Sequence, residues 1–149
     1  MKPDATIREI IGRKGATVWS VEPKLSVYEA VEILSTHDIG ALPVISEGQL
    51  LGMFSERDYA RKIVLEGKSS RSTRVTEIMT SPVVCVCSRD TVSSCLKEMT
   101  DKKIRHLPVL ERKKVVGIVS IGDLVMWIIS AQEEEIGRLE TYIAGTYPG

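Results

Sequence analysis

The sequence is poor in the residues that most often carry catalysis or metal binding. Its 149 residues include two histidines, three cysteines and one phenylalanine, and aromatic residues make up 5% of the chain. Neither histidine has a cysteine or carboxylate at ligand spacing, so the sequence gives no support for a metal site. Cys85 and Cys87 share one face of a predicted strand, a spacing more typical of packing than of redox chemistry. Three cysteines cannot all pair, so we expect reduced thiols in a cytoplasmic protein.

Several functional signals are also absent. Twenty basic residues balance 20 acidic residues, so the chain lacks the positive surplus of a broad nucleic-acid surface. The apolar run 125–129 is too short to cross a membrane, and the first residues lead into no apolar stretch typical of a signal peptide. No Gly-x-Ser-x-Gly elbow, Walker loop or Gly-x-Gly-x-x-Gly is present. We therefore expect no nucleic-acid or membrane partner, no catalytic residue and no catalytic cofactor.

What the sequence does contain is an internal repeat. Residues 18–59 align with residues 83–124 without a gap, and ten of the 42 pairs are identical. Most of the identities are apolar residues or glycine and serve equally well to preserve a core. A polar Ser-x-x-Asp motif that follows Gly-apolar-apolar in both halves is different, and it predicts two copies of one binding site. The residues of this motif are Ser55 and Asp58 in the first half and Ser120 and Asp123 in the second.

Each half predicts the order β-α-β-β-α, which makes the fold α+β. The first half places these elements at 18–21, 27–34, 42–45, 50–54 and from 55 onward. The second half places them at 83–86, 92–99, 107–110, 115–119 and from 120 onward. Apolar residues at i, i+3, i+4 and i+7 predict the first helix of each half, and Ser26 and Thr91 are placed to cap these helices. Ser55 and Ser120 are placed to cap the second helices.

Five segments follow from this pattern: a lead-in helix (1–16), the first repeat (17–66), a linker with a second lead-in helix (67–80), the second repeat (81–130) and a helical extension (131–149). The lead-in helices share the pattern apolar-x-Glu-apolar-apolar, at 7–11 and 75–79. The linker is polar and rich in serine, as linkers between structured units often are.

The predicted last helix carries more apolar surface than one half can cover. Residues 124–129 are apolar on every side, and such a helix is normally buried. Past the repeat, Ile136, Leu139, Tyr142 and Ile143 continue an apolar stripe. A second copy of the chain is the simplest cover, so we expect a homodimer.

This pattern resembles the cystathionine-β-synthase (CBS) domain, present here as the tandem pair known as a Bateman module. The residues that carry the resemblance are 37–44 with 52–58, and 104–109 with 117–123. The resemblance implies two halves related by a pseudo-twofold axis, with two clefts between their sheets. Such clefts hold adenosine-containing ligands: AMP, ADP, ATP, NAD(H) or S-adenosylmethionine. It also implies flat dimers, and we expect a regulatory module without an attached catalytic domain.

The resemblance assigns Asp58 and Asp123 to the ribose of the ligand. A carboxylate can accept two hydrogen bonds side by side, which suits the 2′- and 3′-hydroxyls. The alternative is purely structural, because a carboxylate at the third residue after an N-cap is favoured by the helix dipole whatever else it does.

The starts of the second helices are candidate phosphate sites. Free N–H groups at a helix N-terminus can bind an anion, and Ser55 and Ser120 stand at these starts, with a plain N-cap as the alternative role of each. Arg105 and His106 precede the second Leu-Pro-Val segment and are further phosphate candidates. For His106 the alternative is a surface residue in front of a buried strand.

Cations distinguish the first half from the second. Arg57, Arg61 and Lys62 follow the first motif, and we predict that they bind the more highly phosphorylated end of a ligand in the Asp58 cleft. The corresponding residues of the second half are Gly122, Met126 and Trp127. The alternative is a solvated face in which Asp58 and Lys62 form an i, i+4 ion pair.

In similar proteins the adenine lies between the first strand of one half and the segment before Leu-Pro-Val of the other. Mapped onto this sequence, the wall of the Asp123 cleft consists of Thr17, Val18, Trp19, Ile39, Gly40 and Ile118, together with Arg105 and His106. The wall of the Asp58 cleft consists of Val83, Val84, Ile104, Gly40, Ala41 and Met53. For Trp19 a place in the core is the alternative, and His37 is interpreted as a polar residue at a helix end.

The leading hypothesis is a regulatory module that senses AMP, ADP, ATP or NAD(H) in two inequivalent clefts and passes the signal to a protein partner that the sequence does not identify. The alternative is an interaction scaffold whose clefts stay empty. An enzyme lacks support, since no nucleophile, base or metal constellation is present.

Overall fold

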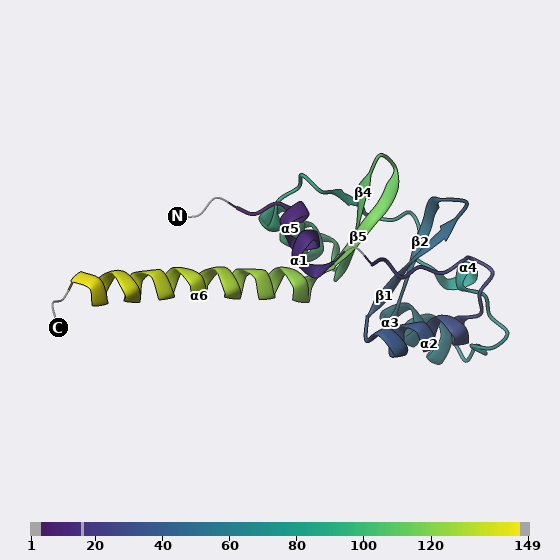
Figure 1. The fold of residues 1–149 in the computed structure, drawn as a ribbon. Helices are drawn as coiled ribbons and strands as arrows, with labels where there is room; N and C mark the ends of the chain where they lie inside the picture. Colours follow the sequence, from purple (N-terminus) through teal and green to yellow (C-terminus); the bar gives the residue numbers. More distant parts are fainter. Residues whose placement is uncertain (1–3, 16, 147–149) are drawn as a thin grey trace.

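The computed structural model describes residues 4–15 and 17–146, with side chains up to residue 141. Two similar α+β halves lie side by side, and a long helix projects from one of them (Figure 1). The first part of the chain forms α1 (Ile7–Lys14), α2 (Val27–His37), β1 (Ala41–Ser46), β2 (Gln49–Ser55), α3 (Glu56–Asp58), the π-helix η1 (Tyr59–Val64) and α4 (Val75–Ile78). The second part forms β3 (Val86–Cys87), α5 (Val92–Lys102), β4 (His106–Glu111), β5 (Lys114–Ser120) and α6 (Ile121–Thr146).

Both predicted hairpins are present. Strand β1 pairs antiparallel with β2, and β4 pairs antiparallel with β5, so that Leu42 faces Phe54 and Leu107 faces Val119. These four side chains are completely buried. The repeated Leu-Pro-Val segment therefore supplies core residues from the middle of the first strand of each hairpin.

The predicted β runs at 18–21 and 83–86 are largely wrong. In the first half only Val21 pairs, through a single parallel bridge to Val44. In the second half the strand is β3, which begins at Val86 and runs parallel to β4. Trp19 is exposed whereas Val21 is buried, so this part of the chain reaches the sheet only at its last residue.

All four predicted N-caps are confirmed. The hydroxyls of Ser26 and Thr91 accept hydrogen bonds from the backbone N–H groups of Glu29 and Ser94, each at 3.1 Å. In the same way Ser55 accepts from Asp58 at 3.2 Å, and Ser120 accepts from Asp123 at 3.1 Å. After this shared start the second helices differ, because the first half continues as the short π-helix η1 and the second as the 26-residue α6.

The lead-in helices are exchanged between the halves. Ile7 and Ile10 of α1 belong to the core formed by α5, β4 and β5 of the second half. Val75 and Ile78 of α4 belong to the core formed by α2, β1 and β2 of the first half. Each helix is held at its start by two backbone hydrogen bonds, and the two pairs match. For α1, Ile7 N donates to Asp90 O and Val92 N donates to Ala5 O. For α4, Val75 N donates to Leu25 O and Val27 N donates to Thr73 O. Each half therefore completes its core with a segment from outside its own repeat.

A repeated glycine makes room for each exchanged segment. A Cβ at Gly117 would lie 2.9 Å from Cδ1 of Ile11, which follows Ile10 in α1. A Cβ at Gly52 would lie 2.6 Å from Sδ of Met79 and 3.0 Å from the backbone oxygen of Thr80, just after α4. The identity of these two positions in the repeat thus has a packing reason.

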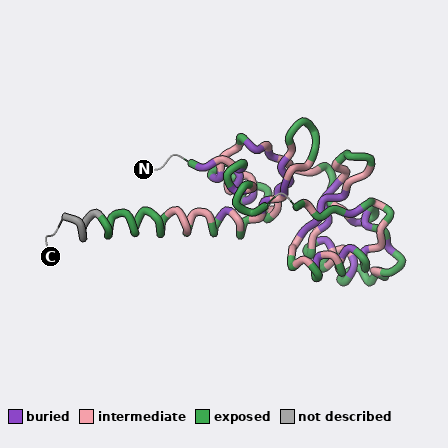
Figure 2. Tube along the Cα trace, in the orientation of Figure 1, coloured by how far each residue is buried: buried purple, intermediate pink, exposed green. Residues whose placement is uncertain are grey.

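Among the residues of α6 whose side chains are described, only those at the beginning pack against the body of the protein. Leu124 is completely buried, and Trp127 and Ile128 pack against the core of the second half. Residues 132–141 are all exposed, and the trace in this part of α6 stands away from both halves (Figure 2). The side chains of Tyr142 and Ile143, which were expected to prolong the apolar stripe, lie outside the described residues.

Replacing Gly52 by valine should lower the free energy of unfolding by about 1–3 kcal/mol, because the new side chain overlaps the backbone of Thr80 as well as Met79. Urea denaturation measures this. Gly12→Ala is the matched control: a Cβ there meets no atom within 4 Å, and alanine favours a helix, so this variant should be at least as stable as the wild type. Equal stability of Gly52→Val and the wild type would contradict the packing role.

Candidate functional site

The two Ser-x-x-Asp motifs form equivalent helix starts. In the first half the backbone N–H of Glu56 donates to the carbonyl of Gly40 at 3.0 Å. In the second half the N–H of Ile121 donates to the carbonyl of Arg105 at 2.9 Å. Each helix start is thereby fixed beside the segment that leads into the Leu-Pro-Val strand. The structure thus brings together, in each half, two of the segments from which the sequence predicted a cleft.

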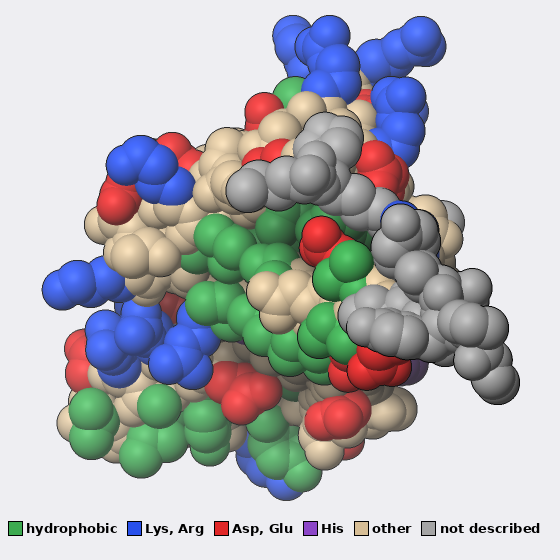
Figure 3. Space-filling view, turned by 90° about the vertical axis from the view of Figure 1, so that its left-hand side faces the viewer, with side chains coloured by type: hydrophobic (Ala, Val, Ile, Leu, Met, Phe, Trp, Pro, Cys, Tyr) green, Lys and Arg blue, Asp and Glu red, His purple; other side chains and the backbone are tan. Residues whose placement is uncertain are grey.

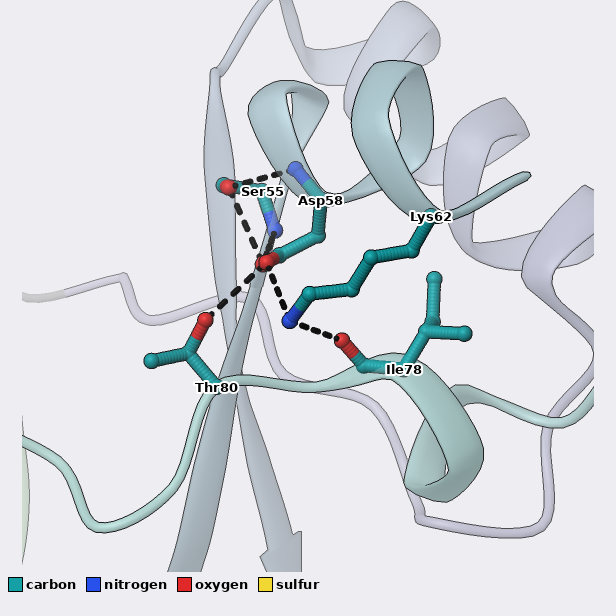
Figure 4. A network of polar contacts seen from close by, with 5 residues as sticks. All are labelled: Ser55, Asp58, Lys62, Ile78 and Thr80. Carbon is teal, nitrogen blue, oxygen red and sulfur yellow. Dashed lines mark hydrogen bonds and ion pairs between the residues drawn. The ribbon is translucent and has the colours of Figure 1, made fainter. Parts of the chain in front are cut away.

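The carboxylate of Asp58 is enclosed by protein groups (Figure 4). Its Oδ2 accepts hydrogen bonds from Ser55 N at 2.9 Å and Ser55 Oγ at 3.0 Å. Its Oδ1 accepts from Thr80 Oγ1 at 2.9 Å and pairs with Lys62 Nζ at 3.0 Å. Lys62 also donates to the carbonyl of Ile78 at 2.8 Å. Asp58 is only 6% exposed, so both of its oxygens are engaged and shielded.

The carboxylate of Asp123 is more open. Its Oδ2 accepts from Ser120 N at 2.8 Å and from Lys14 Nζ at 2.6 Å. The side chain is 25% exposed. Burial works to raise the pKa of Asp123, but the hydrogen bonds from Lys14 and Ser120 outweigh burial and leave that pKa below its usual value. This carboxylate therefore stays ionised at neutral pH while remaining within reach of solvent.

Lys14 is a site residue that the sequence did not predict. It lies at the end of α1, and its ammonium group also donates to the carbonyl of Ile118 at 2.8 Å. The lysine at Asp58 comes from η1, which directly continues α3, whereas the position four residues after Asp123 is Trp127. The second site obtains its lysine through the exchange of α1, a long-range contact that leaves no signal in local spacing.

His106 joins the two halves beside Asp123. A Cβ on Gly40 would lie 3.0 Å from Nε2 of His106, so the imidazole packs directly against the first half at a position where a larger residue would crowd it. Burial and the charges of Lys14 and Arg105 lower the pKa of His106, and the opposing charge of Asp123 does not reverse this. The imidazole is therefore mostly neutral at pH 7, whereas the neighbouring Arg105 is exposed and its role in phosphate binding stays a prediction.

The three cations of the first half have separate environments. Arg57 donates to the carbonyl of Lys103 in the second half at 2.8 Å, beside the predicted wall residue Ile104. Arg61 is exposed on η1. Lys62 pairs with Asp58, so the i, i+4 ion pair considered as the alternative is present. Their role in phosphate binding stays a prediction.

The predicted adenine walls differ in how far they are open. In the wall of the Asp58 cleft, the buried residues are Ala41 and Met53, and the half-buried ones are Val83, Val84 and Ile104. In the wall of the Asp123 cleft, Thr17 is exposed, and the half-buried residues are Val18, Ile39, Gly40 and Ile118. Trp19 is 44% exposed and stacks on His37 with ring centroids 3.6 Å apart and an interplanar angle of 14°. The alternative interpretation, that Trp19 belongs to the core, is therefore wrong. Its indole ring instead packs on the ring of His37 near the surface.

One hollow of about 370 Å³ lies at the ends of the two hairpins. Leu50, Leu51, Pro82, Cys85 and Leu110 line it, and of the predicted site residues only Val83 does so. Neither aspartate faces this hollow, so it is separate from the two Ser-x-x-Asp sites.

Metal ligands do not cluster in the described part of the chain: no three His, Cys, Asp or Glu residues there are placed to hold a metal ion. Cys85, Cys87 and Cys95 are all free thiols. Burial raises the pKa of Cys85, and burial together with Asp90 raises the pKa of Cys95 to about 11. These two thiols are therefore protonated and weakly nucleophilic at neutral pH.

A doubled unit of helix, β-hairpin and helix, with one aspartate beside a capping serine in each copy, defines a duplicated α+β module with two equivalent helix starts. The family model described as CBS domain matches residues 7–65 and again residues 75–130. The chain therefore belongs to the CBS domain family and carries two copies of the domain. The family and the α+β fold predicted from the sequence are both confirmed.

Three similar proteins place the chain within this family. The CBS domain-containing protein CBSX3, mitochondrial, of Arabidopsis thaliana is 39% identical over 152 residues, which cover 95% of this chain and 73% of that protein. A putative signal-transduction protein with CBS domains from Burkholderia ambifaria MC40-6 is 40% identical, with a TM-score of 0.83 over 86% of this chain and 96% of that one. The CBS domain pair of protein MJ0100, solved with 5-methylthioadenosine and S-adenosyl-L-methionine, is 26% identical, with a TM-score of 0.77 over 87% of this chain and 99% of that one.

His106 should make stability depend on pH. Because the pKa of His106 is lowered in the folded protein, the unfolded chain binds the proton more readily, and stability should fall as pH drops below about 6.5. We expect His106→Gln to flatten the change in unfolding free energy between about pH 7.5 and 5.5, as measured by urea denaturation. His37→Gln, at the other histidine of the chain, is the matched control. An undiminished pH slope in His106→Gln would argue against the half-buried, neutral imidazole.

Proposed function

We propose that this chain is a non-catalytic regulatory module that binds an adenosine-containing ligand, namely AMP, ADP, ATP or NAD(H), in the clefts between its halves. The observation that carries the proposal is the pair of equivalent helix starts, each of which presents an aspartate beside the segment before the Leu-Pro-Val strand. The binding of 5-methylthioadenosine and S-adenosyl-L-methionine by the related MJ0100 pair supports the same ligand class.

The two sites differ in what a ligand must displace. At Asp123 a ribose hydroxyl would donate to a carboxylate that is partly open to solvent. At Asp58 it must replace Thr80 or Lys62, because both oxygens are engaged. A Lys62 released in this way would be free to bind phosphate, as would Arg61. The inequivalence predicted from the sequence thus becomes a proposal that the Asp123 cleft fills more readily, while the Asp58 cleft selects the more phosphorylated ligand.

A ligand in these clefts would act on the contacts that join the halves. Arg57 reaches the carbonyl of Lys103 across the boundary, and His106 packs on Gly40 across the same boundary. An adenine or phosphate inserted beside either contact would change the relative position of the halves. Through such a change in the relative position of the halves, ligand binding would alter the contacts of the module with a regulated protein.

One observation favours the alternative of an interaction scaffold with empty clefts. The Asp58 network is complete without a ligand, since four protein donors surround a carboxylate that is only 6% exposed. A structural role alone would account for this half. The more open Asp123 is what leads us to prefer a sensor.

We also propose that two copies associate through the first turns of α6. Val125, Met126 and Ile129 are 43%, 60% and 42% exposed, and they adjoin the packed Trp127 and Ile128. No charged residue interrupts this surface between Leu124 and Ser130. A symmetric pair would cover the same apolar surface on both chains.

The cellular compartment stays a prediction. None of the described helices is long and apolar enough to cross a membrane. Reduced thiols led us to expect the cytoplasm, and the related CBSX3 is named as mitochondrial.

Asp123→Ala should weaken the binding of AMP, measured by titration calorimetry, by about 1–3 kcal/mol, because a charged hydrogen-bond acceptor is lost. Asp58→Ala should weaken the binding of ATP or NAD more than that of AMP. Asp101→Ala, on the exposed face of α5, is the control and should bind like the wild type. If AMP, ADP, ATP, NAD and NADH all fail to bind the wild type, the sensor proposal fails and the scaffold stands.

The intact chain should behave as a dimer at micromolar concentration in light scattering, and Met126→Asp should convert it to a monomer without unfolding it, because Met126 is 60% exposed. Leu65→Asp is the matched control: Leu65 is 78% exposed on the other half and should not affect the dimer. A monomeric wild-type chain would refute the association.

A further inference from the structure

The exposed part of α6 has the residue pattern of a coiled-coil seam. Five residues follow one another at alternating intervals of four and three: Val125, Ile129, Gln132, Ile136 and Leu139. With isoleucine at the a positions and leucine at the last d position, this is a heptad repeat of the kind that pairs two helices. Ile136 and Leu139 are 55% and 57% exposed, so the distal seam, from Gln132 to Leu139, has no cover within the described chain.

The distal seam lies on a different face of α6 from the residues that pack on the body. Leu124 is buried, and Trp127 and Ile128 contact the core of the second half. At 3.6 residues per turn the seam lies about a third of a turn away from this packed face. A helix about 39 Å long at 1.5 Å per residue therefore carries its own apolar stripe well beyond the body (Figures 1 and 2).

Acidic residues border the distal seam on both sides. With Ile129 and Ile136 at a, the e positions are Glu133 and Glu140 and the g position between them is Glu135. All three are exposed. Seen with the end of α6 toward the viewer, hydrophobic side chains gather near the middle of the molecule, and acidic side chains lie among and below them (Figure 3).

This charge pattern determines what can cover the distal seam. In a parallel pair of identical helices Glu135 of one copy faces Glu140 of the other, and in an antiparallel pair e faces e and g faces g. Both arrangements of a second copy set glutamate against glutamate, which is unfavourable. A helix with lysine or arginine at its e and g positions would place opposite charges there instead.

We propose that the distal seam of α6 docks an amphipathic helix of a different protein, one whose own apolar seam is flanked by lysine or arginine. The apolar first turns of α6 remain available to a second copy of the chain, and the acidic segment beyond them selects the basic partner. This rests on α6 alone, so it stands whether or not the clefts bind a nucleotide. It gives the module a contact through which it could reach a regulated protein.

A synthetic peptide of three heptads, with Ile at a, Leu at d and Lys at e and g, tests the proposal with the full chain. Fluorescence anisotropy should show that this peptide binds at least ten times more tightly than a peptide with Glu at e and g. Raising the salt from about 0.05 to 0.5 M should weaken binding. Ile136→Ser with Leu139→Ser should reduce it at least tenfold, while circular dichroism confirms an intact fold.

Charge reversal provides the sharpest comparison. The variant Glu133→Lys, Glu135→Lys, Glu140→Lys should exchange the preference and bind the Glu peptide. The control Glu22→Lys, Glu32→Lys, Glu66→Lys makes the same change in net charge at exposed positions of the first half and should keep the wild-type preference. Failure of the Lys peptide to bind, equal binding of both peptides, or a preference that charge reversal leaves unchanged would overturn the proposal. The proposal would also be overturned if the wild-type chain is a homodimer and the Ile136→Ser variant is a monomer, because a second copy would then occupy the distal seam.

Discussion

The packing of each lead-in helix on the opposite half is the constraint on which the rest of this structure depends. In each half the hairpin and the helices of the repeat leave an apolar face that α1 or α4 must cover. Gly52 and Gly117 permit the close approach, because a side chain at either would overlap the exchanged segment. Each lead-in helix thereby ties one repeat to the other, and the two repeats cannot separate without opening both cores.

The same exchange completes the two sites. Lys14 reaches Asp123 because α1 ends beside β5, and Thr80 reaches Asp58 because it follows α4. The two carboxylates started as copies of one motif, but the exchanged segments give them different partners. One becomes a closed network of four donors, and the other keeps an open side. Inequivalence between the sites thus arises from the lead-in segments as much as from the repeats.

Local patterns in the sequence predicted the elements that depend on local physics. Apolar spacing predicted α2 and α5, the repeated Leu-Pro-Val segment predicted the hairpins, and the capping serines were all confirmed. The sequence did not predict the partner of Asp123, because Lys14 is brought there by a contact between residues 109 positions apart. The first strand predicted for each half was also too long. Its β-branched residues favour a strand, but only Val21 in the first half and the residues from Val86 in the second have a neighbouring strand to pair with. Trp19 was more exposed than the core alternative allowed because it stacks on His37 at the surface.

The central claim is that the open carboxylate at the start of α6 holds the ribose of an adenosine-containing ligand. A crystal structure of the chain with AMP tests it most directly. The ribose hydroxyls should lie within hydrogen-bond distance of the carboxylate of Asp123, with Lys14 or Arg105 turned toward the phosphate. AMP found instead in the hollow between the hairpins, or a cleft that stays empty at millimolar AMP with Lys14 still on Asp123, would contradict the claim.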